Sequence, residues 1–336
     1  MPPPTSTSLP RLSAPLQIGW TGRHATASPR SSRLRSATFH IGNGTLIHGD
    51  FHDVLSALPE KSIDFIYADP PFRTERVRRM TGAQAGRAGY DDRFTPGQYL
   101  NLLDDLIRLS RSLLKPTGTL AIHVDHRATH WVRLLLDEHF GPDAFVNDII
   151  WRYGLGNARA ERHFARKHDV ISVYAAGPAY YFCPQRGEVT AAQRAKYCHR
   201  DSHGHFMISY GRKYYLKGGR KLDSVLDIPS LSPTDRSRTG YPTQKPLRLL
   251  ETLIRAFCPL NAQSIVVDPM CGSGTTLEAA QQAGVRWIGM DRNHNAFRIT
   301  KRRLQSLLSQ PPPPVQPDRA RRVDRKRPGD LVPSAL

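Results

Sequence analysis

The tetrapeptide Asp69-Pro70-Pro71-Phe72 combines two hydrogen-bond acceptors with a flat aromatic face. It directly follows an apolar run, residues 63–68, that predicts a buried strand. The Asp69 carboxylate and the Pro70 carbonyl could each accept a hydrogen bond from one amino group, and the prolines fix the turn without adding a competing N–H. Two such acceptors would draw an aromatic amine toward tetrahedral geometry and free its lone pair. Phe72 could stack on the ring that carries this amine.

A second loop, residues 268–276, has glycines at the point where a strand-like run gives way to a predicted helix. Open α/β sheets place ligands at such points, and a helix start favours a carboxylate or another anion. Asp291 ends the next predicted strand, where it could accept hydrogen bonds from two ribose hydroxyls. The loop contains Asp268, Pro269, Met270, Cys271, Gly272, Ser273, Gly274, Thr275 and Thr276.

The glycine loop lacks the features of two common nucleotide sites. A dinucleotide fingerprint needs a small residue where Leu277 stands, and no Gly-Lys-Ser/Thr follows the glycines as a P-loop requires. S-adenosylmethionine is an adenosine cofactor that needs no pyrophosphate cradle, and its methyl group is already activated. Either motif alone could be no more than a turn, but the flanking Asp268 and Asp291 favour a cofactor site.

Three segments together resemble the amino-methylating DNA methyltransferases of the permuted β group. Residues 69–72 match that family's catalytic DPPY/F, residues 268–276 look like its cofactor loop, and residues 241–246 are similar to its HPTQKP segment. The resemblance covers residues 42–308, with the catalytic motif first and the cofactor loop last, which is the β-group order. It implies catalytic roles for Asp69, Pro70, Pro71 and Phe72.

The same resemblance implies roles in holding the cofactor. In that family the HPTQKP segment holds the methionine end, so Lys245 would meet the cofactor carboxylate, and Asp50 would lie near the adenine ring. Two departures are visible: Met270 replaces the usual Phe, and Tyr241 replaces the usual His. The cofactor contacts implied in this way are Asp50, Thr243, Gln244, Lys245, Asp268, Pro269, Met270, Cys271, Gly272, Ser273, Gly274, Thr275 and Asp291.

These motifs must be positioned by an alternation of strands and helices. Apolar periodicity predicts strands at 45–48, 63–68, 119–124, 145–151, 170–174, 264–267 and 287–290. Helices are predicted at 51–58, 96–113 (capped by Thr95, with Pro96 first), 131–140, 246–257, 275–283 and 296–308. The fold class is therefore α/β, a Rossmann-like methyltransferase sandwich with a mainly parallel sheet and a circularly permuted motif order.

Composition divides the chain into five parts. Residues 1–38, rich in Pro, Ser and Arg, predict a disordered basic arm, with an organellar transit peptide as the alternative. The catalytic part would be 39–151 and the cofactor-binding part 240–309. Between them, 152–239 would be an inserted target-recognition region. Residues 310–336 predict a second disordered basic tail.

Most of the positive charge between residues 50 and 309 lies in the middle stretch 151–225, which holds fourteen Lys/Arg and five Asp/Glu. A local positive field attracts nucleic acid, although a solvated basic surface would show the same composition. We expect double-stranded DNA as the partner. The expected DNA contacts are Arg159, Arg162, Arg166, Lys167, Arg212 and Lys213.

Several alternatives stay open. N6-adenine methylation is the main hypothesis and N4-cytosine methylation the runner-up. RNA remains a possible substrate. The hypothesis from a different functional class is a catalytically inactive DNA-binding protein. C5-cytosine chemistry needs a Pro-Cys nucleophile that the sequence lacks. The cluster Cys198, His199, His203 and His205 is not expected to bind a metal. The cysteine spacing and the absence of a membrane span predict a cytoplasmic protein. A homodimer and a restriction endonuclease partner are both possible.

Overall fold

The computed structural model describes residues 37–81, 88–154 and 160–309, and a nine-stranded sheet forms its centre. Strands β1 and β8 run antiparallel to their neighbours, and the other seven strands of this sheet run parallel to one another. The prediction of a mainly parallel sheet is therefore confirmed. Across the sheet the order is β1 (Ala37–Ile41), β2 (Gly44–His48), β14 (Arg286–Asp291), β13 (Ile265–Asp268), β3 (Ile63–Ala68), β6 (Leu114–Val124), β8 (His168–Ala175), β7 (Phe145–Arg152) and β12 (Val225–Asp227).

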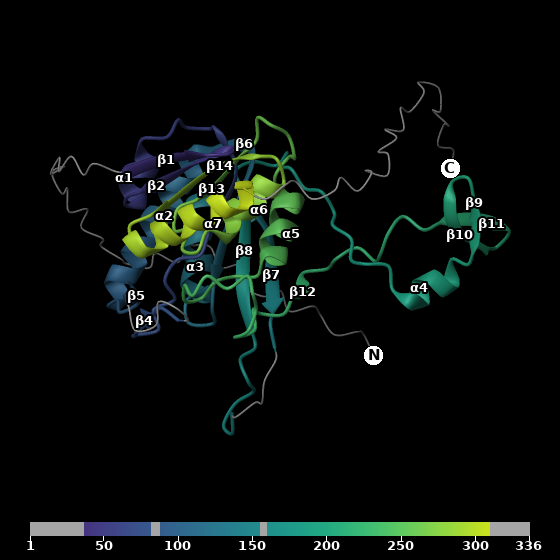
Figure 1. Ribbon diagram of the computed structural model, residues 1–336, viewed down its shortest axis with the longest axis horizontal. Helices are drawn as coiled ribbons and strands as arrows, with labels where there is room; N and C mark the ends of the chain where they lie inside the picture. The colour runs from purple at the N-terminus through teal and green to yellow at the C-terminus, as the bar shows by residue number, and fades with distance from the viewer. Residues whose placement is uncertain (1–36, 82–87, 155–159, 310–336) are drawn as a thin grey trace, which may run out of the picture. The chain divides into compact units, whose positions relative to one another are not determined.

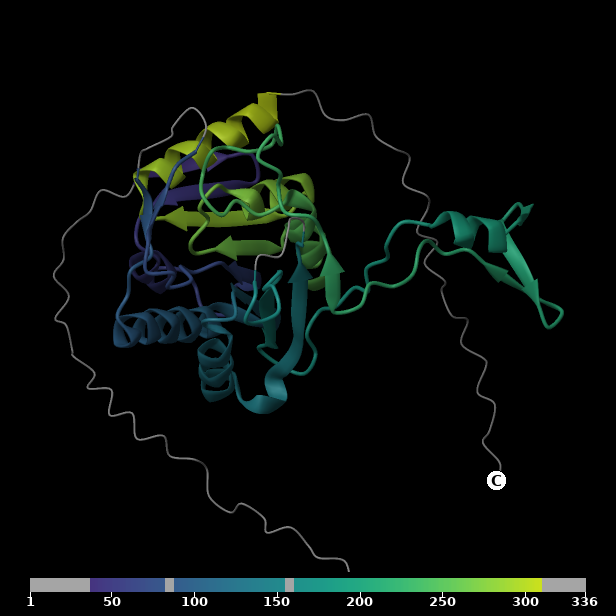
Figure 2. The same ribbon diagram turned by 90° about the horizontal axis from the view of Figure 1, so that it is seen from below.

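Helices cover both faces of the sheet and make three layers (Figures 1 and 2). One face carries α1 (Phe51–Ser56), α2 (Pro96–Leu113) and α3 (Thr129–Phe140), with the 3-10 turn Pro142–Ala144 after α3. The other face carries α5 (Leu247–Phe257), α6 (Thr275–Gln282) and α7 (His294–Ser309). Each strand of the middle of the sheet therefore contributes side chains to two cores, one on either side.

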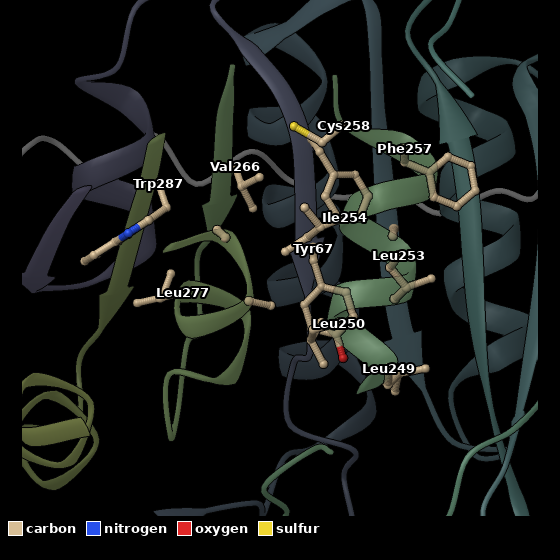
Figure 3. Close-up of a cluster of buried hydrophobic side chains, with 14 of the residues drawn as sticks. Tyr67, Leu249, Leu250, Leu253, Ile254, Phe257, Cys258, Val266, Leu277 and Trp287 are labelled. Carbon is tan, nitrogen blue, oxygen red and sulfur yellow. The ribbon is translucent and has the colours of Figure 1, made fainter. Parts of the chain in front are cut away.

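Local sequence explains where the long helix α2 begins. The Thr95 hydroxyl accepts from the Gln98 N–H, the Gln98 side-chain oxygen accepts from the Thr95 N–H, and Pro96 occupies the first helical turn. This capping box confirms the start predicted from the sequence. On the opposite face, α5 turns an apolar stripe toward β3 and β13, and Figure 3 shows it packed beside Tyr67 and Val266.

Two expectations about irregular segments need correction. Residues 37 and 38 were expected to belong to a disordered arm, but they open the edge strand β1, which pairs with β2 through a tight turn at Gly42. The polar stretch 73–92, for which the sequence predicts neither strand nor helix, contains a hairpin of β4 (Val77–Arg79) and β5 (Ala88–Asp91). The rest of 1–38 and all of 310–336 lie outside the described residues.

The predicted insertion 152–239 is not continuous. Strand β8 is buried along most of its length and lies between β6 and β7, while β12 pairs with β7 at the sheet edge. The apolar run of β8 must be buried on both faces, which only the central sheet offers. A separate three-stranded sheet follows the helix α4 (Ala191–Lys196), and its strands are β9 (His199–Asp201), β10 (Gly204–Ser209) and β11 (Arg212–Tyr215).

No helix within the described residues is both long enough and apolar enough to cross a bilayer.

We expect Leu253→Ala to lower the free energy of unfolding by about 2–5 kcal/mol, because the Leu253 side chain in α5 is only 1% exposed. Urea unfolding followed by circular dichroism measures this change. The matched control is Leu308→Ala in α7, where the side chain is 46% exposed and the expected effect is below about 0.5 kcal/mol. Equal losses in the two variants would contradict this packing of α5 on the sheet.

Candidate active site

Four neighbouring parallel strands each end in an aspartate at the same edge of the sheet. Asp50 follows β2, Asp291 ends β14, Asp268 ends β13 and Asp69 follows β3. Parallel strands bring their carboxyl ends together, so carboxylates that are up to 241 positions apart in the sequence converge here. The order of these strands in the sheet, rather than their order in the chain, builds the site.

A cavity of about 370 Å³ opens at this edge. A smaller one of about 30 Å³ adjoins it and shares Asp69 and Gly272 with it. Of the residues predicted for the site, the larger cavity is lined by Asp50, Asp69, Pro70, Pro71, Phe72, Thr243, Pro269, Met270, Gly272 and Asp291. The smaller cavity is lined in addition by Gln244, Lys245, Asp268, Cys271, Ser273 and Thr275. Gly274 lines neither cavity and instead caps α6.

The catalytic tetrapeptide is held by a buried ion pair. The Lys245 ammonium contacts one oxygen of the Asp69 carboxylate, Oδ2, and the Lys245 side chain is 7% exposed. The same ammonium lies 5.1 Å from the centre of the Phe72 ring, within range of a cation–π contact. The other carboxylate oxygen, Asp69 Oδ1, is buried and makes no hydrogen bond to any described residue. Because Asp69 lines both cavities, this oxygen is an acceptor available to a bound molecule.

Lys245 contacts a carboxylate of the chain that the sequence did not predict. The resemblance to the permuted β group implies a contact with the methionine carboxylate of the cofactor. In the structure the Lys245 ammonium contacts Asp69. The two residues meet because α5 follows Pro246 directly and packs against β3, which places Lys245 beside the end of that strand. Lys245 thus belongs to the catalytic motif as well as to the cofactor segment.

A buried polar network lies behind Phe72. His123, at the end of β6, shares a hydrogen bond of 2.7 Å with the Tyr67 hydroxyl and one of 3.2 Å with Asp169. Burial, together with the nearby Lys245, lowers the pKa of His123. The Phe72 ring lies 6.0 Å from the His123 ring. His123 is therefore a neutral support for the aromatic face of the site at pH 7. Asp169, near the start of β8, supplies the carboxylate of this network.

Two glycines determine the shape of the loop 268–276. Gly272 has a φ of 52°, and a β-carbon there would stand 3.1 Å from the Tyr241 ring. Gly274 has a φ of 76°, and a β-carbon there would approach Thr300 to 2.6 Å. Both positions require glycine because L-residues with side chains rarely adopt this backbone conformation. Glycine at these two positions therefore fixes the path of the loop against Tyr241 and Thr300.

Two carboxyl groups of the site are electrostatically unusual. Burial raises the pKa of Asp268 to about 7 and that of Asp291 to about 6. Asp291 accepts hydrogen bonds of 2.9 Å from the Gly272 N–H and 2.8 Å from the Asn293 N–H, so it fixes the glycine loop. Asp268 accepts one of 3.1 Å from the Met270 N–H. Each carboxyl shapes the loop and retains acceptor capacity toward the cavity.

The adenine end predicted for the cofactor begins at Asp50, which caps α1. His52 lies between Asp50, at 2.8 Å, and Asp105 of α2, at 3.0 Å. These carboxylates raise the pKa of His52, with the hydrogen bond to Asp50 as the largest cause. His52 thereby ties α1 to α2 beside the cavity.

Several lining residues were not found from the sequence. Tyr90 lies in the β4–β5 hairpin, which the sequence did not predict, so nothing in the sequence placed Tyr90 at the site. Its ring stacks on Tyr241, with the ring centroids 6.3 Å apart. Tyr241 stood in a recognised motif but was not assigned to the site. The residues missed in the lining of the larger cavity were Phe51, Tyr90, Asp91, Leu102, Tyr241, Arg292 and Asn293.

The residues expected to contact DNA fall into two groups. Arg162, Arg166 and the partly buried Lys167 lie between β7 and β8, and Arg159 of the same connection lies outside the described residues. Arg212 and Lys213 lie on β11 of the separate sheet, where Lys213 pairs with Asp201 at 3.0 Å. Within the described chain no three His, Cys, Asp or Glu side chains are grouped so that they could hold a metal ion.

Comparison with known proteins agrees with this geometry. The family profile described as DNA methylase matches residues 63–302, which is more than half of the chain. The chain belongs to the DNA methylase family. The matched region contains Asp69, Lys245, Asp268 and Asp291, so both halves of the site lie within it.

Individual relatives are distant from this DNA methylase. The type II methyltransferase M.EcaI of Enterobacter cloacae is 27% identical over 73% of this chain, and this chain spans only 65% of the length of M.EcaI. The DNA adenine methyltransferase YhdJ of Escherichia coli (strain K12) is 25% identical over 77% of this chain and 82% of its own length. The solved structure of the PvuII DNA methyltransferase (cytosine-N4-specific) superposes with a TM-score of 0.55 at 15% identity, over 78% of this chain and 86% of that one. This similarity confirms the fold.

The raised pKa of Asp268 predicts how the stability of the ligand-free protein depends on pH. The folded protein keeps the Asp268 proton up to pH about 7, whereas an unfolded aspartate loses it near 3.8. The free energy of unfolding therefore falls as pH rises between these values, by up to about 1.4 kcal/mol per unit. We expect Asp268→Asn to flatten this slope, and urea unfolding at pH 5 and pH 8 measures it. Parallel slopes for wild type and Asp268→Asn would show that Asp268 is ionised throughout.

Proposed function

We propose that this DNA methylase transfers a methyl group from S-adenosylmethionine to the exocyclic N6 amine of adenine in duplex DNA. One observation carries the proposal. The Asp69 carboxylate has one oxygen fixed by Lys245 and the other, Oδ1, buried without a partner among the described residues. A buried acceptor without a partner is costly unless a ligand supplies the donor, and an amino group is such a donor.

The residues around this oxygen suit a planar base that carries an amine. The Pro70 carbonyl can accept the second N–H of the amine, because no proline N–H competes for it. Phe72 lines the cavity and is supported from behind by His123, which gives the base a fixed surface to stack on. An adenine inside the double helix cannot reach a cavity of this kind, so the base must be extruded from the duplex.

S-adenosylmethionine, when bound, supplies an activated methyl group. The residues of the chain therefore have to position the amine and the cofactor, and none of them has to act as a nucleophile. Gly272 lines both cavities, and its positive φ shapes the loop that would lie against the ligand. Asp291 and Asp50 line the larger cavity and are acceptors suited to the ribose and adenine parts. Membership of the DNA methylase family supports this cofactor.

The choice of adenine over cytosine rests on position 69 and on one relative. The permuted β group tends to carry Ser-Pro-Pro where cytosine is the target, and this chain has Asp69. The relative YhdJ is named a DNA adenine methyltransferase. N4-cytosine methylation uses the same geometry and is the alternative outcome of the experiment below. The type II methyltransferases among the relatives support a role beside a restriction endonuclease.

We expect the wild-type chain, expressed in a host free of DNA methylation, to leave N6-methyladenine in one sequence context. Single-molecule sequencing maps the sites, and mass spectrometry of digested nucleosides identifies the base. Asp69→Ala should abolish the modification, with a loss of at least about 10³-fold in labelled methyl transfer, while DNA binding persists. N4-methylcytosine without N6-methyladenine would overturn the choice of base.

The catalytic role of Asp69 is tested separately from that choice. If wild type binds DNA but transfers no methyl group to any duplex, the chain is a DNA-binding protein on this scaffold. If Asp69→Ala transfers methyl as fast as wild type, the carboxylate has no role in the reaction. Asp91→Ala is the matched control, because Asp91 also lines the larger cavity but forms an ion pair with Arg93.

A further inference from the structure

The connection between β7 and β8 begins and ends at the edge of the sheet that holds the active site. Strand β8 runs antiparallel to both β6 and β7, so β7 runs parallel to β6 and β3. The end of β7 at Arg152 therefore lies at the same edge as the end of β3, where Asp69 stands. The segment from 176 to 224 joins β8 to β12 and is attached at the opposite edge.

The root of this connection is tied to the site by hydrogen bonds. The Tyr153 N–H donates to the Lys167 carbonyl at 3.1 Å, which closes the base of the loop. The Tyr153 hydroxyl also donates to Asp169 at 3.1 Å, and Asp169 contacts His123, whose ring lies 6.0 Å from that of Phe72. The loop thus shares its support with the aromatic face proposed to hold the target base.

The described tip of the loop, residues 160–167, presents a bare aromatic ring among positive charges. Phe164 is 99% exposed, which is unusual for so large an apolar side chain. Arg162 and Arg166 on either side of it are exposed and make no ion pair with any described residue. Glu161 is the only acidic residue in this tip. An exposed ring flanked by free guanidinium groups suits a polyanion that offers aromatic surfaces to stack on.

We infer that this tip inserts into duplex DNA beside the target base, with Phe164 entering the base stack and Arg162 and Arg166 on the flanking phosphates. The inference rests on the proposed function and adds the element that supports base extrusion. Taking a base out of a duplex leaves a gap and costs stacking, and a ring that enters the stack offsets part of that cost. Arg162 and Arg166, each two positions from Phe164, would hold the phosphates of the DNA strand while the ring fills the gap.

The test compares Phe164→Ala with Tyr210→Ala. Tyr210 is also fully exposed, at 100%, and is followed by Arg212 and Lys213, but it belongs to the segment attached at the opposite edge. Single-turnover methyl transfer is measured on a duplex that carries the mapped site. It is measured again on the same duplex with a mismatch opposite the target base. A mismatched base is cheaper to extrude, so it needs less help from a wedge.

Phe164→Ala should slow transfer about 10- to 100-fold on the matched duplex and no more than about 3-fold on the mismatched one. Tyr210→Ala should stay within about 3-fold of wild type on both duplexes. Because the Phe164 ring is 99% exposed, its removal should not change the melting temperature. Full activity of Phe164→Ala on the matched duplex, or an equal loss on both duplexes, would overturn the inference.

The two arginines are tested by binding, which does not depend on catalysis. The double variant Arg162→Ala/Arg166→Ala should weaken binding to a labelled mixed-sequence duplex and reduce the salt dependence by about two phosphate contacts. Unchanged affinity and salt slope would overturn this part. If wild type transfers no methyl to any DNA, the proposed function fails. The tip is then judged by this binding assay, with Tyr210→Ala as its control.

Discussion

The buried ion pair between Lys245 and Asp69 joins two halves of the site that are 176 residues apart in the chain. It can form because β13 and β3 lie side by side in the sheet and α5 packs across them. Truncating one partner of such a pair leaves an uncompensated buried charge, at a cost of about 3–5 kcal/mol. The pair also orients Asp69, because holding Oδ2 leaves Oδ1 as the acceptor available to a ligand. Substrate positioning and folding thus depend on the same contact.

The permuted order of the motifs follows from the same constraint. A parallel sheet needs only that the ends of neighbouring strands share an edge, so the catalytic strand β3 can precede the cofactor strands β13 and β14 by two hundred residues. Burying a charged carboxylate at that edge is unfavourable, and the pKa values of Asp268 and Asp291 are raised for this reason. The site is therefore less stable without a ligand than a sheet end built from apolar residues would be.

Sequence patterns predicted most of the central sheet and both motifs, because apolar periodicity and turn chemistry are local. They missed the β4–β5 hairpin, since its strands are short, polar and paired only with each other. They also placed β8 inside an insertion, although its apolar run had been noticed, because strand order is a property of the sheet and not of the segment. The contact between Lys245 and Asp69 was missed for a related reason. A lysine near an expected carboxylate ligand gives no sign that a carboxylate of the chain is closer.

The most direct test of this account is a double-mutant cycle on single-turnover methyl transfer, using Lys245→Met and Asp69→Asn. Lys245 acts on the reaction through Asp69, so Lys245→Met should slow wild type by about 10²-fold or more and slow the Asp69→Asn enzyme by less than about 3-fold. Cofactor affinity, measured by calorimetry on each variant, separates an effect on binding from one on transfer. Equal losses from Lys245→Met in both backgrounds would show that the two side chains act independently, and would contradict the account.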